Sequence, residues 1–241
     1  FGKSFDDVYG LMPDQLQLGF LKVLKGSYMQ EHAEEYGLVY KGKPPYEVLG
    51  TSWLSYGEIA QLKKIEEMVE VYYNSGQFAN TLRFLVKEFA SPFRMYEKLS
   101  GYYEEKGLFG RSHTRTARYE ILLDFIGENV KGKTEFYREL LIYDLYLREN
   151  IKSRPEFAGE SLADKEFLKA FYDREEKEPV YLKSYAKTDS RKLRKMTHIE
   201  VFEFQVDRDM KPRKIVLLFD YQNRNPLNYE AAVFRIGQKE E

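Results

Sequence analysis

The sequence predicts an α+β protein with a mainly helical body and a C-terminal antiparallel sheet. Apolar residues recur at helical spacing from Ser55 to about Ala170. After Pro179 the spacing shortens to alternation, and the residues become rich in Val, Ile, Tyr and Phe, which is typical of strands. An apolar segment close to the start indicates one further strand, which we interpret as the last piece of an α/β unit.

The first residues have the order helix, turn and strand. The stretch "SFDDVYGLMP" has apolar residues at helical spacing, with Ser4 as the predicted N-cap and Pro13 as the stop. The stretch "QLQLGFLKV" (15–23) alternates, so we expect a strand with two different faces. One face carries Leu16, Leu18 and Phe20, and the other carries Gln17, Gly19 and Leu21. Because a parallel strand rarely stands alone, neighbouring strands are expected to be missing.

The middle of the chain predicts a series of helices. The stretch "YMQEHAEEYGL" indicates a short helix closed by Gly37, and Pro44 and Pro45 indicate a loop after it. Ser55 and Glu58 have the spacing of a capping box, which predicts the start of the next helix. The predicted helices cover 55–76, 77–90, 91–107, 114–130, 133–150 and 161–175.

The last part of the chain predicts a small sheet of three or four strands. Turn signals separate the predicted strands, notably between Asp207 and Pro212 and between Asn223 and Pro226. Alternating or continuous apolar residues define the predicted strands 180–189, 197–209, 213–225 and 229–237.

Composition narrows the classes of function. The net charge of −1 argues against a broad nucleic-acid surface. The chain has no Cys, so no disulfide and no thiolate-bound cluster is possible, and nothing suggests secretion. Apolar runs are too short to span a membrane, so we expect a cytoplasmic protein without membrane contact. The 20 Tyr and 17 Phe indicate either a core rich in aromatic rings or an aromatic-lined cleft.

Motifs for catalysis or metal binding are not found. There is no glycine-rich phosphate loop and no pair of histidines at ligand spacing, so we assign no catalytic or metal-binding residue. The stretch "GLFGRSHTRTAR" (107–118) places Arg next to a predicted helix start, which suits either an anion site or an ordinary loop.

The stretch "KTDSRKLRKMTH" (Lys187 to His198) is the second feature of interest. It is a basic run that suits either a solvated, hairpin-like connection or a contact with an anion or a nucleic acid. The candidate anion-binding residues are Lys187, Arg191, Lys192, Arg194 and Lys195.

Three stretches together resemble one family. They are "PDQLQLGFLKVLKGS", "KPPYEVLGTSWLSYGEI" and "VEVYYNSGQFANTL". They are similar to the C-terminal part of cobalamin-dependent radical SAM proteins, which are iron–sulfur oxidoreductases with a C-terminal domain of unknown function. "VLKGS" (Val23 to Ser27) stands where a late barrel strand of that family ends in a small-residue turn of the type "xPGT", and Lys25 replaces the frequent Pro.

The resemblance implies a domain organisation. Residues 1–40 would be the end of a partial (β/α) barrel, 41–178 the helical body and 179–241 a small antiparallel β region. Earlier barrel strands, a cobalamin-binding domain and a CxxxCxxC cluster loop would lie upstream, outside this sequence. The iron–sulfur cluster, S-adenosylmethionine and cobalamin are then cofactors of the parent protein, and we expect this chain to bind none of them itself.

The resemblance also implies a function. We expect an accessory region that covers the barrel and shapes the substrate site without being catalytic alone, with the upstream radical SAM and cobalamin-binding domains as partners. Gln17, Lys22 and Lys25 are the substrate-side candidates, because barrel active sites lie at the ends of the strands. Without upstream strands, we expect an unpaired edge and an apolar patch at Leu16, Leu18 and Phe20, shielded either by self-association or by rearrangement of the first ~30 residues. The alternative is a helical module that binds a protein partner or RNA through the basic run.

Overall fold

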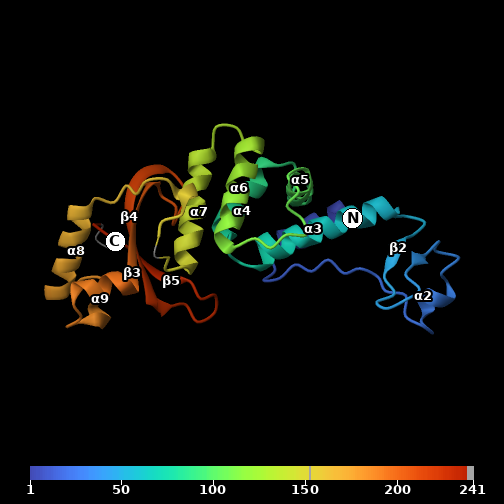
Figure 1. Cartoon of the computed structure of the whole chain (residues 1–241), viewed down its shortest axis with the longest axis horizontal. Coiled ribbons are helices and arrows are strands. Elements are labelled where there is room, and N and C mark those ends of the chain that lie inside the picture. Colours follow the sequence, from blue (N-terminus) through green and yellow to red (C-terminus); the bar gives the residue numbers. More distant parts are fainter. Residues whose placement is uncertain (152, 238–241) are drawn as a thin grey trace. The chain divides into compact units, whose positions relative to one another are not determined.

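A computed structural model of the chain describes residues 1–151 and 153–237 and contains the helical body and C-terminal sheet that the sequence predicts (Figure 1). The chain folds into two compact units. Unit 1 consists of Phe1–Gly76 and Leu85–Arg111. Unit 2 consists of Gln77–Phe84 and the described residues from Ser112 onward. The two units are defined by contacts in the folded chain. The predicted segments 1–40, 41–178 and 179–241 are defined by sequence patterns, so the division into these three segments stays a prediction.

Unit 1 is built around three helices. Its elements are α1 (Gly2–Gly10), α2 (Tyr28–Glu31), β1 (Val39–Tyr40), β2 (Val48–Gly50), α3 (Tyr56–Met68), the π-helical segment η1 (Val69–Asn74), the 3₁₀ turn η2 (Val86–Glu88) and α5 (Pro92–Glu105). Both α1 and α3 pack against α5. The β1 and β2 strands form a small antiparallel ribbon inside the region predicted as a loop.

Local chemistry explains where the helices of unit 1 begin. The predicted capping box is present: the Ser55 hydroxyl accepts a hydrogen bond from the Glu58 backbone N–H, and the Glu58 carboxylate accepts one from the Ser55 N–H at 2.8 Å. Ser91 caps α5, and Pro92 is its first residue, as predicted. The predicted cap at Ser4 is wrong, because α1 already begins at Gly2 and no side chain caps it.

The apolar stripe predicted for α3 forms the core of unit 1. All of its predicted members are buried, namely Ile59, Leu62, Ile65, Met68, Val69 and Tyr72. The last two lie in η1, where the wider π-helical turn continues the stripe.

Residues 15–23 differ from the prediction. They form no regular strand; the bridge between Lys22 and Glu47 is their sole β-pairing among the described residues. Exposure still alternates as in an extended chain, because Leu16 and Leu18 are buried whereas Gln17 and Gly19 are exposed. Leu16 and Leu18 are only 6% and 7% exposed, so the chain covers these two side chains itself and the expected patch is not open to solvent. Asn74 replaces a neighbouring strand by accepting from the Leu16 N–H at 2.8 Å and donating to its C=O at 3.1 Å.

Unit 2 combines helices with a sheet. Its helical elements are α4 (Ala79–Leu85, whose last residue belongs to unit 1), α6 (Arg115–Asn129), α7 (Thr134–Arg148), α8 (Lys165–Lys177), α9 (Ser190–Met196) and the 3₁₀ turns η3 (Glu156–Ala158) and η4 (Lys183–Tyr185). The strands β3 (Thr197–Phe204), β4 (Pro212–Arg224) and β5 (Ala231–Arg235) form an antiparallel sheet in the order β3-β4-β5. The predicted sheet of three or four strands is thereby confirmed with three.

The sheet of unit 2 is covered on both faces (Figure 1). On one face α7 packs against β3 and β5, and Tyr143 contacts Phe202 and Phe219 with ring centroids 6.2 and 6.0 Å apart. On the other face, residues from α8, α9 and the segment between them form a buried cluster with two sheet residues, Ile199 and Leu218. Because successive side chains of a strand point to opposite faces, apolar residues at neighbouring positions cover both faces of the sheet.

The strand predicted at 180–189 and the hairpin-like connection after it are both wrong. The backbone N–H groups of Val180, Tyr181 and Leu182 all donate to the buried Glu175 carboxylate at 2.9–3.0 Å, so they are not available to a β-ladder. The chain then enters α9, which Asp189 caps by accepting from the Lys192 N–H at 3.0 Å. The basic run is thus largely helical.

We predict different effects for the two serines that the sequence marks as caps. Replacing Ser55→Ala removes half of the capping box and should lower the free energy of unfolding by about 1 kcal/mol. Replacing Ser4→Ala, which removes an exposed hydroxyl that caps nothing, should change it by less than about 0.5 kcal/mol. Urea unfolding followed by circular dichroism checks both, and equal losses would contradict this account of the helix starts.

Candidate functional site

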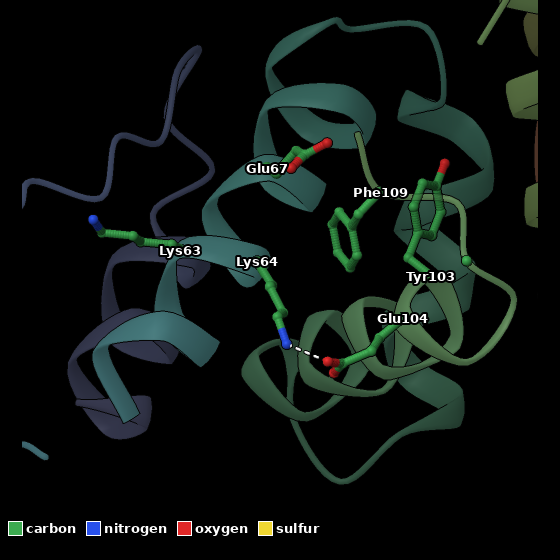
Figure 2. Close-up of a pocket in the computed structure, with 7 residues that line it drawn as sticks. Lys63, Lys64, Glu67, Tyr103, Glu104 and Phe109 are labelled. Atoms are coloured by element: carbon green, nitrogen blue, oxygen red, sulfur yellow. Dashed lines mark hydrogen bonds and ion pairs between the residues drawn. The ribbon is translucent and has the colours of Figure 1, made fainter. Parts of the chain in front are cut away.

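A pocket of about 350 Å³ lies in unit 1, between α3 and the end of α5 (Figure 2). Its lining residues are Lys63, Lys64, Glu67, Tyr103, Glu104, Gly107 and Phe109. The volume is at the lower end of the range for small-molecule sites, and the lining combines aromatic rings with charges of both signs.

The turn after α5 brings an aromatic ring into this pocket. Gly107 has a φ of +62°, a left-handed conformation that ends the helix. The Leu108 N–H then donates to the Tyr103 C=O at 2.8 Å, so the chain folds back and Phe109 packs on Tyr103 with ring centroids 5.4 Å apart. The Tyr103 and Tyr72 hydroxyls are hydrogen-bonded at 2.7 Å in the core, which fixes the Tyr103 ring.

Ion pairs organise the charges around the pocket. Lys64 Nζ lies 2.5 Å from Glu104 Oε1, and Lys63 Nζ lies 2.5 Å from Glu47 Oε1, outside the lining. Hydrogen bonds from the Lys63 and Lys41 ammonium groups lower the pKa of Glu47. In Figure 2 the Lys63 side chain extends away from Phe109, whereas Lys64 reaches Glu104. Lys64 is therefore the lining lysine whose carboxylate partner also lines the pocket.

The predicted substrate-side residues do not line this pocket. Gln17, Lys22 and Lys25 are all exposed on or next to the extended segment 15–23. Lys22 stands at the bridge to Glu47, and Lys25 lies in a turn in which the Ser27 N–H donates to the Leu24 C=O at 3.1 Å. The structure thus leaves these three side chains accessible without placing them in an enclosed site.

The predicted anion-binding residues gather on one helix. With 3.6 residues per turn, Arg191, Lys192, Arg194 and Lys195 span an arc of about 160° on α9, opposite the buried Leu193. These four residues, which we call the α9 basic face, are exposed, and no carboxylate within 1–151 and 153–237 forms an ion pair with them.

The two ends of the basic run behave differently from the α9 basic face. Lys187 precedes the helix in a left-handed conformation, with a φ of +70°. His198, which the sequence places in the same run, turns away from it. Its Nε2 lies 3.3 Å from Glu200 Oε2, and its ring stacks on Tyr146 at 3.8 Å.

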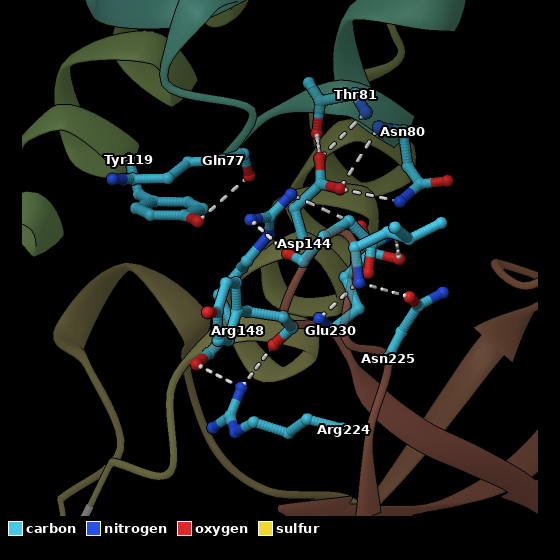
Figure 3. A network of polar contacts seen from close by, with 12 residues as sticks. Gln77, Asn80, Thr81, Tyr119, Asp144, Arg148, Arg224, Asn225 and Glu230 are labelled. Atoms are coloured by element: carbon cyan, nitrogen blue, oxygen red, sulfur yellow. Dashed lines mark hydrogen bonds and ion pairs between the residues drawn. The ribbon is translucent and has the colours of Figure 1, made fainter.

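Sequence reasoning missed the buried carboxylates of unit 2. Glu200 is almost completely buried and pairs with Arg154 as well as with His198. Asp144 is also buried, and it lies in α7 (Figure 3). An Asp within an apolar helical stretch, at a position that periodicity assigns to the core, is the signal that could have identified it.

Asp144 holds the beginning of α4. Its carboxylate accepts four hydrogen bonds, from the backbone N–H groups of Asn80 and Thr81 and from both of their side chains, at 2.7–3.1 Å (Figure 3). Burial nevertheless raises the pKa of Asp144 to about 6, because desolvation outweighs these hydrogen bonds. Nearby, Arg148 donates to the Asn228 C=O and pairs with Glu230 at 3.4 Å. The Asp144 group therefore anchors structure and offers no open position to a substrate.

Two further properties bear on function. No cluster of three or more His, Asp or Glu side chains suited to a metal ion occurs in the part of the chain that the structure describes. No helix there is both long and apolar enough to cross a membrane.

Comparison with known proteins gives one match. Residues 34–219 match the family described as "Protein of unknown function (DUF4080)". No curated protein and no solved structure matches the chain. The matched residues cover most of both units and begin after the stretch at 13–27 that contains the substrate-side candidates.

We predict that Asp144 makes stability depend on pH. Because its folded-state pKa of about 6 exceeds the ordinary 3.8, its contribution is fully present below about pH 4 and is lost as the pH rises through 6. The loss should be on the order of 3 kcal/mol between pH 4 and 7.5.

Urea unfolding of the wild type and of Asp144→Asn across this pH range provides the measurement. The variant cannot titrate at this position, so the difference between the two free energies of unfolding isolates Asp144. A difference that stays constant from pH 4 to 7.5 would show that burial does not control this carboxyl.

Proposed function

The chain belongs to the DUF4080 family, and on that premise we propose that it is the C-terminal accessory region of a radical SAM, cobalamin-dependent iron–sulfur oxidoreductase. In this proposal the chain covers the barrel of the parent protein and shapes its substrate site, while the upstream domains bind the cluster, S-adenosylmethionine and cobalamin. The resemblance of three separate stretches, one of which lies before the matched residues, supports this assignment.

The extended segment 15–23 is the structural observation that carries the proposal. The backbone N–H and C=O of Leu16 both bind Asn74. Since alternate residues of an extended chain direct these groups to opposite sides, those of Gln17 and Gly19 are directed away from Asn74. The backbone groups of 17–20 form no hydrogen bond with any described residue. Such a free edge accepts an added strand, and we propose that an upstream barrel strand of the parent protein pairs there.

The positions of the polar side chains support a role beside the substrate. Gln17, Lys22 and Lys25 are exposed along or just after this edge. A strand added at 17–20 would lie next to them, and the two ammonium groups would then face an anionic group of the substrate or of S-adenosylmethionine. Covering the site would also exclude water, which protects reactive intermediates.

We predict that pairing protects backbone amides at the free edge. In the 241-residue chain, the amides of Gln17 and Gly19 should exchange with deuterium at nearly the rate of an unstructured peptide. In the longer protein that contains the upstream strands, both should exchange at least about 100-fold more slowly.

Hydrogen exchange read by mass spectrometry checks this expectation, with light scattering to confirm that both samples are monomeric. The amide of Leu16, already bonded to Asn74, is the internal control. Equal exchange of Gln17 and Gly19 in the two proteins would exclude strand pairing at this edge.

We predict that the lysines act on turnover and not on cofactor content. Replacing Lys22→Ala together with Lys25→Ala in the full-length protein should leave the iron–sulfur content normal and reduce turnover by about tenfold, the effect of about 1.4 kcal/mol. The matched control is Lys3→Ala with Lys98→Ala, which removes two exposed lysines outside the segment. Unchanged turnover in the Lys22 and Lys25 variant would remove their substrate role.

The α9 basic face favours a second candidate function, binding of RNA. Its four cations are exposed and not neutralised by described carboxylates, and such a surface can contact consecutive phosphates. The net charge of −1 restricts this candidate to a local contact.

Salt dependence tests the second candidate. If α9 contacts RNA, replacing Arg191→Ala and Lys195→Ala should weaken binding of a tRNA probe and reduce the slope of log affinity against log salt by roughly 1 to 2. The control is Lys98→Ala with Lys165→Ala, an equal change of charge outside α9. Affinity that does not depend on salt, or an equal loss in the control, would dismiss RNA binding by α9.

A further inference from the structure

We propose that the pocket between α3 and the end of α5 binds a small zwitterion with an apolar body, of the class of the aromatic α-amino acids. The inference concerns unit 1 alone and does not depend on the accessory role proposed above.

The charges of the lining select a ligand that carries both signs. Two lysines and two carboxylates contribute to the lining, so charges of both signs border the pocket. A dianion would be repelled by Glu67 and Glu104, and a dication would be repelled by Lys63 and Lys64. A zwitterion places each of its charges next to an opposite one.

One ion pair is suited to exchange partners with the ligand. Lys64 and Glu104 pair at the surface, where their side chains are 31% and 58% exposed. Such pairs contribute little to stability, so the ligand carboxylate can take over Lys64 at little cost. Lys63 is less available because the Glu47 carboxylate, outside the lining, holds its ammonium group.

The Glu67 carboxylate can pair with the ligand's ammonium group. The Glu67 carboxylate lies in the lining and forms no ion pair or hydrogen bond with the described residues. When the ligand carboxylate takes Lys64, Glu104 also becomes free to accept from the ammonium group. Both ligand charges thus obtain a partner without a buried charge being left unpaired.

The apolar part of the ligand has a fixed surface to lie on. In Figure 2 the Phe109 ring lies among the side chains of Glu67, Lys64 and Tyr103. Phe109 is partly buried and is supported by Tyr103, so an aromatic ligand can stack on it with little ordering of the protein. The pocket volume of about 350 Å³ suits a ligand of this size.

The test uses the 241-residue chain and three probes that share a phenyl ring on a two-carbon chain and differ in the charged groups that this chain carries. L-phenylalanine carries both charges, 3-phenylpropionate lacks the ammonium group, and phenethylamine lacks the carboxylate. Titration followed by ¹⁵N NMR should show saturable shifts at Lys64, Glu67, Glu104 and Phe109. L-phenylalanine should bind at least about fivefold more tightly than either of the others.

Two variants with opposite expectations identify the charged partners. Lys64→Gln should weaken L-phenylalanine about fivefold without weakening phenethylamine, while Glu67→Gln should weaken both of these without weakening 3-phenylpropionate. Lys98→Gln, on α5 outside the lining, is the control for Lys64→Gln.

Several results would overturn the proposal. They are an absence of saturable binding, shifts confined to residues outside the pocket, or equal affinity for L-phenylalanine and 3-phenylpropionate. Circular dichroism verifies that each variant is folded. Lys64→Gln removes a positive charge and Glu67→Gln removes a negative one, so if one variant fails to fold, the other still tests the proposal.

Discussion

The carboxylate of Asp144 is the interaction on which unit 2 depends. Residues 77–84 belong to unit 2 although the chain on both sides of them belongs to unit 1. Two N–H groups at the start of α4 have no partner within their own helix, and Asp144 accepts from both. Tyr119 adds a hydrogen bond from its hydroxyl to the Gln77 C=O at 3.1 Å. The Asp144 carboxylate can be buried here because four donors form hydrogen bonds with it. Its raised pKa reflects the part of the desolvation free energy that these hydrogen bonds do not offset.

The sequence predicted the elements whose cause is local. The capping box at Ser55, the Pro92 start of α5 and the stripe of α3 follow from spacing alone, and all are present. Alternating or continuous apolar residues also located β3, β4 and β5, whose sheet is covered on both faces within unit 2. Two of the errors occur where a side chain replaces a backbone partner. Glu175 accepts from the N–H groups of 180–182, and Asn74 accepts from that of Leu16, and the apolar pattern predicts neither contact.

The candidate sites depend on groups that folding leaves without partners. The backbone of 17–20 forms no hydrogen bond with a described residue, and neither the α9 basic face nor the Glu67 carboxylate forms an ion pair with one. The basic residues could be identified from the sequence because they are close together along the chain. The sequence could not identify the pocket, because Lys64, Glu104 and Phe109 are brought together by the packing of α3 on α5 and by the turn at Gly107. It also assigned His198 to the basic run, although Glu200 and Tyr146 hold its side chain.

The interleaving of the two units constrains the order in which the chain can fold during synthesis. Residues 77–84 leave the ribosome after most of unit 1, but their anchor is separated from Thr81 by 63 residues. At roughly 5–20 residues per second, α4 therefore waits several seconds without its cap. Unit 1 in turn is complete only after α5 has followed, so residues of unit 2 are synthesised between its two parts. Until Asp144 has been synthesised, the donors of Asn80 and Thr81 can bond only to water, so burying them earlier would leave them unsatisfied at a cost in free energy.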